Sequence, residues 1–277
     1  MSDKQKRQMR EALGLAFKLV LGLLIVSPLF YAVSVSLMPR VDVLANPPRL
    51  LPSEPTLRNF QKVMELVPVG RYLLNSLVVS GIEIAAQVLF SSFAAYAFAF
   101  LEFRGKNLLF MMVIATMMIP GETTVISNYL TIQNSSLIDT YGGLVLPGLV
   151  SGMGIFLLRQ FYLTVPRDIK DAATVDGCGH IAFFFRILMP ISLTSISSLS
   201  IYIFVRTYNA FFWPLLVTNT DNMRTVQIGI GYLLNSEAVD YGVVMAGAVL
   251  ALVIPILVFI VGLKYLVSGM VTGAIKG

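Results

Sequence analysis

The chain has 277 residues, of which 56% are hydrophobic and only 13% are charged, with a net charge of +5. Soluble domains carry about 25% charged residues, so this composition excludes an ordinary soluble protein and indicates an integral membrane protein. The basic residues show no nucleic-acid-binding pattern, and their excess is typical of the cytoplasmic loops of membrane proteins. We therefore expect a lipid bilayer, and no nucleic acid, among the partners.

Six apolar stretches are long enough to be membrane-spanning helices, which predicts an all-α integral membrane fold. The first follows a basic head, as in a signal peptide, but it exceeds the usual apolar core of about 7–15 residues. The predicted organisation is an N-terminal tail at 1–12, a six-helix domain at 13–267 and a C-terminal tail at 268–277. The predicted spans are 13–37, 73–101, 108–124, 141–161, 187–210 and 243–267.

The Lys and Arg residues indicate how these spans are oriented. The basic N-terminal head, the turn at 102–107 and the loop at 164–186 fall on one side, which the positive-inside rule assigns to the cytoplasm. The loop at 38–71 on the opposite side also carries basic residues, but they are mixed with acidic ones. Both termini are therefore expected in the cytoplasm of a multi-pass cell-membrane protein.

The loop at 164–186 is charged in the middle of an apolar sequence. Each charged residue would cost about 2.5–3.5 kcal/mol at the centre of a span, which excludes a lipid-exposed helix there. Pro166 and nearby acidic residues predict a helix start, and Gly177 and Gly179 predict a helix end that needs a positive φ. The expected helix would present a low-profile face of Ile169, Ala172 and Ala173, on which another surface could dock; an ordinary helix that caps the bundle is the alternative.

The spacing within this loop resembles the EAA loop of ABC importer permeases. Asp171-Ala172-Ala173, Gly177, Ile187 and Met189-Pro190 stand at the spacing of that motif, with Asp171 in place of Glu and Met189 in place of Leu. The resemblance implies the type I permease fold and a coupling helix that docks in a cleft of an ATPase subunit. It implies an ATPase-coupling role for Asp171, Ala172, Ala173, Gly177, Ile187 and Pro190.

Other segments are similar to the carbohydrate-uptake subfamily, in particular to the second permease of maltose-type importers. These are "FLLRQFYLTVP", "NAFFWPLLVTNTDNMRTVQIGI" and the C-terminal "VFIVGLKYLVSGMVTGAIKG". The resemblance implies a heterodimer with a second permease, two ATPase subunits, an extracytoplasmic solute-binding protein and a sugar substrate. The only Gly-Lys pair, Gly105-Lys106, lacks the rest of a P-loop, so ATP and Mg²⁺ are expected on the partner subunits and no cofactor or enzymatic activity on this chain.

Several polar residues inside the predicted spans are candidates for a substrate pathway. Ionisable groups in a membrane point at a cavity or at one another, so two interpretations stay open: a polar, aromatic-lined sugar path, or a structural pair of Glu83 and Arg206. Gly148 and Gly152 form a G-x-x-x-G pattern that predicts close helix packing, by default within the chain. The pathway candidates are Glu83, Gln87, Glu122, Tyr202, Arg206, Asn209 and Trp213.

Two other functions fit parts of the sequence. The same importer architecture could carry a phosphorylated polyol such as glycerol phosphate, because Arg206 could meet an anion. A stand-alone secondary transporter would leave the EAA-like loop unexplained, and no clear internal repeat is visible.

The single cysteine, Cys178, excludes an internal disulfide. With His180 it supplies too few ligands for a metal site, so a structural role is expected for both residues.

Overall fold

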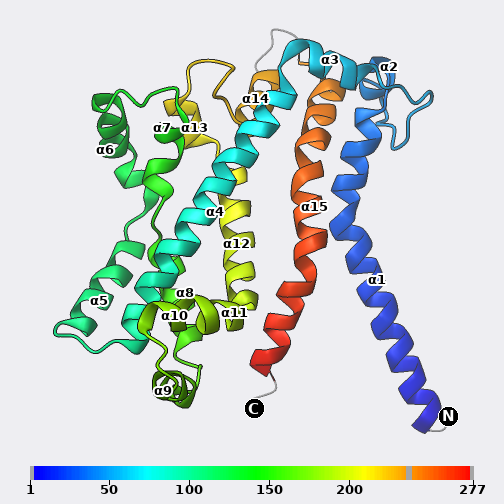
Figure 1. Ribbon diagram of the computed structural model, residues 1–277. Helices are drawn as coiled ribbons and strands as arrows, with labels where there is room; N and C mark the ends of the chain where they lie inside the picture. The colour runs from blue at the N-terminus through cyan, green and yellow to red at the C-terminus, as the bar shows by residue number, and fades with distance from the viewer. Residues whose placement is uncertain (1–2, 235–238, 275–277) are drawn as a thin grey trace. The chain divides into compact units, whose positions relative to one another are not determined.

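The computed structural model describes residues 3–234 and 239–274, and every regular element in these residues is a helix (Figure 1). Of the predicted tails at 1–12 and 268–277, residues 1–2 and 275–277 lie outside the described residues. The chain divides into two compact units, one of residues 1–69 and 230–252 and one of residues 70–229 and 253–277. The elements are α1 (Asp3–Ser36), α2 (Arg40–Val43), α3 (Arg58–Leu66), α4 (Val69–Phe100), α5 (Lys106–Met117), α6 (Gly121–Asn134), α7 (Tyr141–Val145), the 3₁₀ helix η1 (Leu146–Gly148), α8 (Gly152–Tyr162), α9 (Arg167–Val175), α10 (His180–Phe183), the π-helix η2 (Phe184–Leu188), α11 (Met189–Ile191), α12 (Leu193–Tyr208), α13 (Phe212–Val217), α14 (Val226–Leu234) and α15 (Tyr241–Ala274).

Three helices are by themselves long and apolar enough to cross a membrane. They contain the segments Leu13–Ser36, Val69–Phe100 and Tyr241–Gly262, which correspond to the predicted first, second and sixth spans. The other three predicted spans fall on bent helix pairs, so the described residues hold three spans, or up to six if each pair is one span. The bends are 94° between α5 and α6, 48° between α7–η1 and α8, and 76° between α10–α11 and α12.

The expectation of one continuous helix in each of the third, fourth and fifth spans is therefore wrong. Each bend has a proline at or next to it: Pro120 precedes α6, Pro147 lies in η1 and Pro190 lies in α11. Proline lacks a backbone N–H and disfavours a helical conformation in the residue before it, so the hydrogen-bond ladder stops. At the second bend Ser151 begins the new helix, because its hydroxyl accepts a hydrogen bond from the amide of Gly154.

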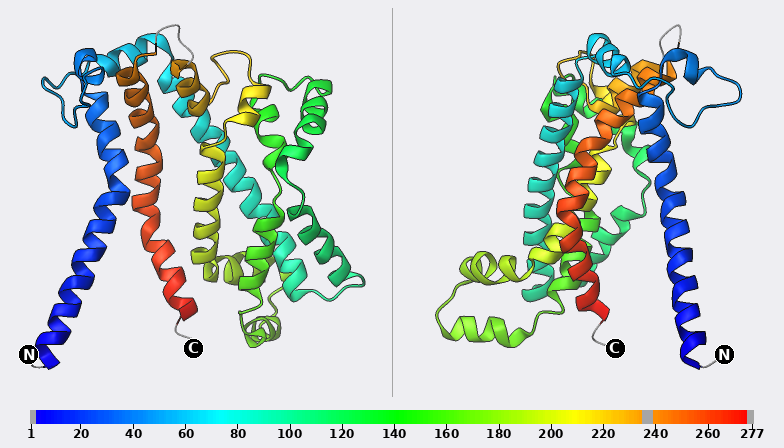
Figure 2. Two further views of the ribbon diagram at one scale, coloured as in Figure 1. Left: turned by 180° about the vertical axis from the view of Figure 1, so that it is seen from behind. Right: turned by 90° about the vertical axis from the view of Figure 1, so that its right-hand side faces the viewer.

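The larger unit packs its helices around α4. One cluster of buried residues joins the second half of α4 to α8, η2 and the middle of α12, and it includes Ala173 of α9. Aromatic stacking fixes η2 on α4, since the rings of Phe93 and Phe184 lie 4.6 Å apart. In Figures 1 and 2, the α4–α5 turn, α9 and α10 lie at one end of this unit, and α6, α7 and α13 lie at the other.

Gly148 and Gly152 pack within the chain, as expected by default. A Cβ at Gly148 would overlap the carboxylate of Glu83 on α4, and a Cβ at Gly152 would lie 2.9 Å from Met117 on α5. The two glycines therefore face different helices, and the pattern does not form one helix–helix seam. Their shared purpose is to let the bent α7–α8 segment approach its neighbours closely.

The smaller unit contains α1–α3 and the first half of α15. Asn59 of α3 is buried and donates hydrogen bonds to the carbonyls of Ser36 and Met38, both at 2.9 Å, which satisfies the end of α1. Lys62 pairs with Asp240 at 3.1 Å. Most of the apolar part of α1 is exposed, and only its end, at Ser34, Val35 and Ser36, is buried by the chain, so lipid or another subunit must cover the rest.

Candidate functional site

A cavity of about 430 Å³ lies in the larger unit, among α4, α6, the α7–η1 segment, α12 and α13. Four of the predicted pathway residues line it: Glu83, Glu122, Arg206 and Trp213. They come from four different helices, so only the folded bundle brings them together. Sequence reasoning missed other lining residues, among them Asn128, Thr207, Phe211 and Phe212.

Glu83 is the centre of the polar contacts in this cavity. Its Oε2 accepts hydrogen bonds from Arg206 Nη2 at 3.0 Å, Thr207 Oγ1 at 2.6 Å and Gln87 Nε2 at 3.2 Å. Glu83 is only 6% exposed, whereas the side chain of Arg206 is 47% exposed. The ion pair considered at the sequence level is therefore present, and its arginine also faces the cavity, so the two interpretations do not exclude each other.

Two further predicted residues act as supports for the wall. Gln87 lies behind Glu83 and also donates to the carbonyl of Gly148 at 2.6 Å, which joins α4 to η1. Trp213 Nε1 donates to the carbonyls of Gly143 and Leu144, both at 3.2 Å. The indole N–H is thus used within the protein, and the ring is held in the cavity wall.

Tyr202 and Asn209 do not line this cavity. Tyr202 is 45% exposed. Asn209 donates to the carbonyl of Val205 at 2.9 Å and lines a separate groove of about 260 Å³ with Phe204, Tyr208 and Pro255. The pathway candidates on α12 therefore do not act together, because Arg206 turns toward Glu83 on α4 while Asn209 lies toward α15.

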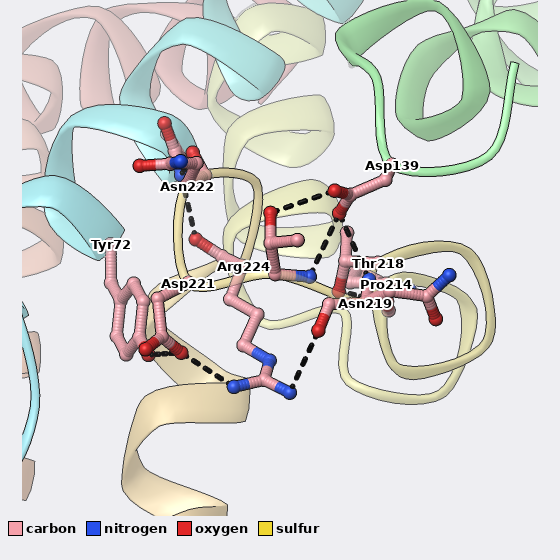
Figure 3. A network of polar contacts seen from close by, with 10 residues as sticks. Tyr72, Asp139, Pro214, Thr218, Asn219, Asp221, Asn222 and Arg224 are labelled. Atoms are coloured by element: carbon pink, nitrogen blue, oxygen red, sulfur yellow. Dashed lines mark hydrogen bonds and ion pairs between the residues drawn. The ribbon is translucent and has the colours of Figure 1, made fainter.

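The loop at 218–225 is fixed at two points beside the cavity (Figure 3). At the first, the carboxylate of Asp139 accepts hydrogen bonds from the amides of Asn219 and Thr220, at 2.9 and 3.0 Å, and from the Thr220 hydroxyl at 2.7 Å. Burial alone would raise the pKa of Asp139, but these hydrogen bonds and the charge of Arg224 bring its pKa below the ordinary value.

At the second point the loop is held by Tyr72 and Asn75 of α4. Tyr72 Oη donates to Asp221 at 2.7 Å, and this bond, together with Arg224, lowers the pKa of Asp221. Asn75 is buried and donates to the carbonyls of Asn222 and Arg224 at 2.8 and 2.9 Å. The chain from 218 to 225 is thus a braced segment, whose last residue, Thr225, lines the cavity.

The EAA-like loop forms the expected short helix, α9. It ends in a Schellman motif: the amides of Gly177 and Cys178 donate to the carbonyls of Thr174 and Ala173, at 3.0 and 2.8 Å. Gly177 has φ +76°, which confirms it as the glycine that ends the helix. The same expectation for Gly179 is wrong, because Gly179 has φ −71° and is the N-cap residue that precedes α10.

Side chains of the motif differ in exposure. Asp171 and Ala172 are exposed, while Ala173 is 6% exposed and packs in the α4–α8 cluster. Ile187 is half-buried in η2, and Pro190 is exposed in α11. Only part of the motif is therefore available to another subunit; the rest attaches α9 to this one.

Three basic side chains cap the C-terminal end of α4, and sequence reasoning did not foresee them. Lys106 Nζ donates to the Leu101 carbonyl at 2.8 Å, Lys170 Nζ to the Phe100 carbonyl at 2.9 Å and Arg159 Nε to the Phe98 carbonyl at 3.4 Å. Cations at this end also interact favourably with the helix dipole. Because Lys170 belongs to α9, its bond ties the EAA-like helix directly to α4.

Cys178 and His180 stand close to this region. The Tyr96 hydroxyl and His180 Nδ1 form a hydrogen bond of 2.9 Å, which joins α4 to α10. Cys178 packs against the buried cluster that contains Ala173. In the described part of the chain, no group of three or more His, Cys, Asp or Glu side chains is placed to hold a metal ion.

Comparison with known proteins identifies the family. Residues 87–271 match the family described as binding-protein-dependent transport system inner membrane component. The chain belongs to this family. The matched range includes the whole EAA-like loop and the cavity helices α6, α7, η1, α12 and α13, and it begins in α4 just after Glu83.

Curated relatives and a solved structure agree with this family. The arabinooligosaccharides transport system permease protein AraQ of Halalkalibacterium halodurans is 31% identical over 96% of this chain and 95% of that protein. The sn-glycerol-3-phosphate transport system permease protein UgpE of Brucella melitensis is 34% identical, over 91% and 93%. A bacterial ABC transporter involved in the import of the acidic polysaccharide alginate shares the fold, with TM-score 0.81 and 18% identity over 96% of this chain and 99% of that one.

This chain is thus a permease subunit of an ABC importer and lies in the cell membrane. In such importers ATP hydrolysis belongs to separate subunits, and a solute-binding protein is a further partner. The permease contributes the helices that cross the bilayer, which agrees with the three to six spans in the described residues.

Replacing Gly177 by alanine is expected to loosen the end of α9 in the permease. No atom lies within 4 Å of a Cβ at Gly177 or at Gly179, so space is not limiting at either position. Only Gly177 has a left-handed backbone, and a side chain there costs about 1–2 kcal/mol. Hydrogen exchange of residues 167–178 is expected to quicken in Gly177→Ala and not in the matched control Gly179→Ala; equal exchange in both variants would contradict this reading.

Acid is expected to release the loop at 218–225. Because the folded-state pKa of Asp139 lies below 3.8, its ionised form stabilises the folded loop at higher pH, and this contribution is lost as the pH falls through the folded value. Protection factors of the Asn219 and Thr220 amides are expected to fall below about pH 4 in the wild type. Asp139→Asn is expected to show low protection already at neutral pH and little further change; the same acid-induced loss in that variant would rule out Asp139 as the titrating group.

Proposed function

We propose that this permease carries a sugar or oligosaccharide into the cell. In this proposal it pairs with a second, different permease, is driven by two ATPase subunits that bind ATP and Mg²⁺, and receives its substrate from an extracytoplasmic binding protein. The single observation that carries the proposal is the family match over residues 87–271, which includes the EAA-like loop. The relatives named as arabinooligosaccharide permeases support a carbohydrate substrate.

The proposed topology has six spans, with both termini and α9 in the cytoplasm. Each bent pair then counts as one span. The basic residues of the α4–α5 turn and of α9 support the cytoplasmic assignment of that end. A broken span with irregular backbone is tolerated in a membrane where the break faces protein or a water-filled cavity, and the break before α6 leads directly into the cavity at Gly121 and Glu122.

The proposed coupling runs from α9 to both helices that form the ion pair. Asp171, Ala172 and the 88% exposed Val175 would face the ATPase. Lys170 connects α9 to the end of α4, which carries Glu83, whereas η2 and α11 connect α9 to α12, which carries Arg206. Closure of the ATPase subunits would thus act on both walls of the cavity at once.

A phosphorylated polyol is the second candidate substrate. Several relatives are named as sn-glycerol-3-phosphate permeases, with 34% identity over 91% of this chain.

A stand-alone secondary transporter is the rival from another class. Purification in mild detergent is expected to yield this chain with an ATPase in stoichiometric amount, whereas full transport by the isolated chain in liposomes would contradict the proposal.

Lys170 gives a test of the coupling path. Lys170→Met keeps the apolar stem and removes the donor to Phe100, so we expect it to lower the ratio of binding-protein-stimulated to basal ATP hydrolysis in the purified importer by about tenfold, the effect of one charged hydrogen bond. Lys170→Arg can still donate and is expected to retain most of the stimulation. The matched control is Arg167→Met on the same helix, whose exposed side chain makes only a long, solvent-exposed ion pair of 3.9 Å with Glu102. A normal ratio in Lys170→Met would rule out this path.

Arg206 gives a test of the pathway. Arg206→Ala is expected to assemble with the other subunits and to reduce transport by about tenfold or more, because it leaves the buried carboxylate of Glu83 without its ionic partner. Size-exclusion chromatography of the complex and substrate uptake into proteoliposomes measure the two effects separately. Loss of assembly, with no separate defect in transport, would reduce Arg206 to a structural role.

A further inference from the structure

We propose that the cavity between α4, α6, α12 and α13 is a substrate site on this subunit that accepts neutral saccharides and disfavours anionic solutes such as phosphorylated polyols. The inference rests on the proposed function, since it concerns the solute that the importer carries. It follows from the charged residues of the cavity, because Arg206 is paired with Glu83 and Glu122 is unpaired among the described residues.

The cationic group of the cavity is already paired with a carboxylate. Arg206 donates to Glu83 at 3.0 Å, and the same oxygen of Glu83 accepts from Thr207 and Gln87. An anionic substrate that drew Arg206 away from Glu83 would leave a carboxylate that is 6% exposed without its partner, which is a strongly unfavourable change. Among the residues that the structure describes, no other Lys or Arg lines the cavity.

The remaining charge of the cavity is negative. Glu122 lies in the first turn of α6, directly after the break at Pro120, and its carboxylate has no hydrogen-bond or ion-pair partner among the described contacts. With Glu83 paired to Arg206, the cavity therefore holds one surplus carboxylate. Glu122 is exposed, so water screens its charge in part, but a carboxylate in the lining still disfavours a phosphate group beside it.

The same lining suits a sugar. A carboxylate accepts hydrogen bonds from hydroxyl groups, and Asn128 adds an amide that can both donate and accept. Trp213 is held in the wall by its N–H, and Phe211 and Phe212 beside it are exposed, so flat aromatic faces are available for the apolar C–H face of a sugar ring. A volume of about 430 Å³ lies within the range of small-molecule sites.

The test uses the complete importer, purified with its binding protein and reconstituted into proteoliposomes. ATP-dependent uptake is measured for two labelled probes, arabinotriose as the neutral one and sn-glycerol 3-phosphate as the anionic one. The variants are Glu122→Gln and Glu122→Arg, with Glu54→Arg, an exposed residue in the smaller unit and outside the cavity, as the control charge reversal.

The proposal predicts uptake of the neutral probe and not of the anionic one. It also predicts that uptake of arabinotriose falls about tenfold in both Glu122 variants, because each removes a charged hydrogen-bond acceptor. Uptake of arabinotriose in Glu54→Arg is expected to stay unchanged. Three results would overturn the proposal: uptake of glycerol phosphate by the wild type, a gain in arabinotriose uptake in Glu122→Arg, or unchanged arabinotriose uptake in both Glu122 variants. Failure of the proposed function is distinct: no ATPase would co-purify, and ATP would drive uptake of neither probe.

Discussion

The ion pair between Glu83 and Arg206 is the interaction on which the arrangement of the larger unit depends. A carboxylate this deeply buried is tolerated only with a charged partner and additional donors, and Glu83 receives them from Arg206, Thr207 and Gln87. Meeting that need fixes α12 against α4. The α7–α8 segment must also come close, which is why Gly148 stands opposite the carboxylate.

The same two helices meet again near α9. Lys170 bonds the end of α4, and the stacked Phe93 and Phe184 attach η2 to α4 just before α12 begins. The EAA-like helix is thus not an appendage joined by two flexible loops. It has one face built into the permease, at Lys170 and Ala173, and another left exposed, at Asp171, Ala172 and Val175, as the proposed coupling role requires.

The sequence predicted the membrane class, the EAA-like helix and its glycine stop, and the residue types that meet in the cavity. It did not predict the three bends, although a proline accompanies each. The reason is physical: Pro28 and Pro255 lie inside continuous helices, so proline alone does not distinguish a tolerated kink from a break. The sequence did not predict the cap on α4 because Lys106, Arg159 and Lys170 indicate a cytoplasmic position whether or not they bind a carbonyl. The bond from Lys170 also reaches a carbonyl 70 residues away, and no pattern in the neighbouring sequence predicts such a contact.

A double-mutant cycle of Glu83→Gln and Arg206→Met tests most directly whether the ion pair governs the coupled movement of α4 and α12. The quantity to measure is ATP hydrolysis by the purified importer, stimulated by its binding protein. If the pair is the controlling interaction, the double variant is expected to be no worse than the poorer single variant, because each change already removes the same contact. If the double variant instead loses ATP hydrolysis by the product of the two single losses, Glu83 and Arg206 act independently, and that result would contradict this account.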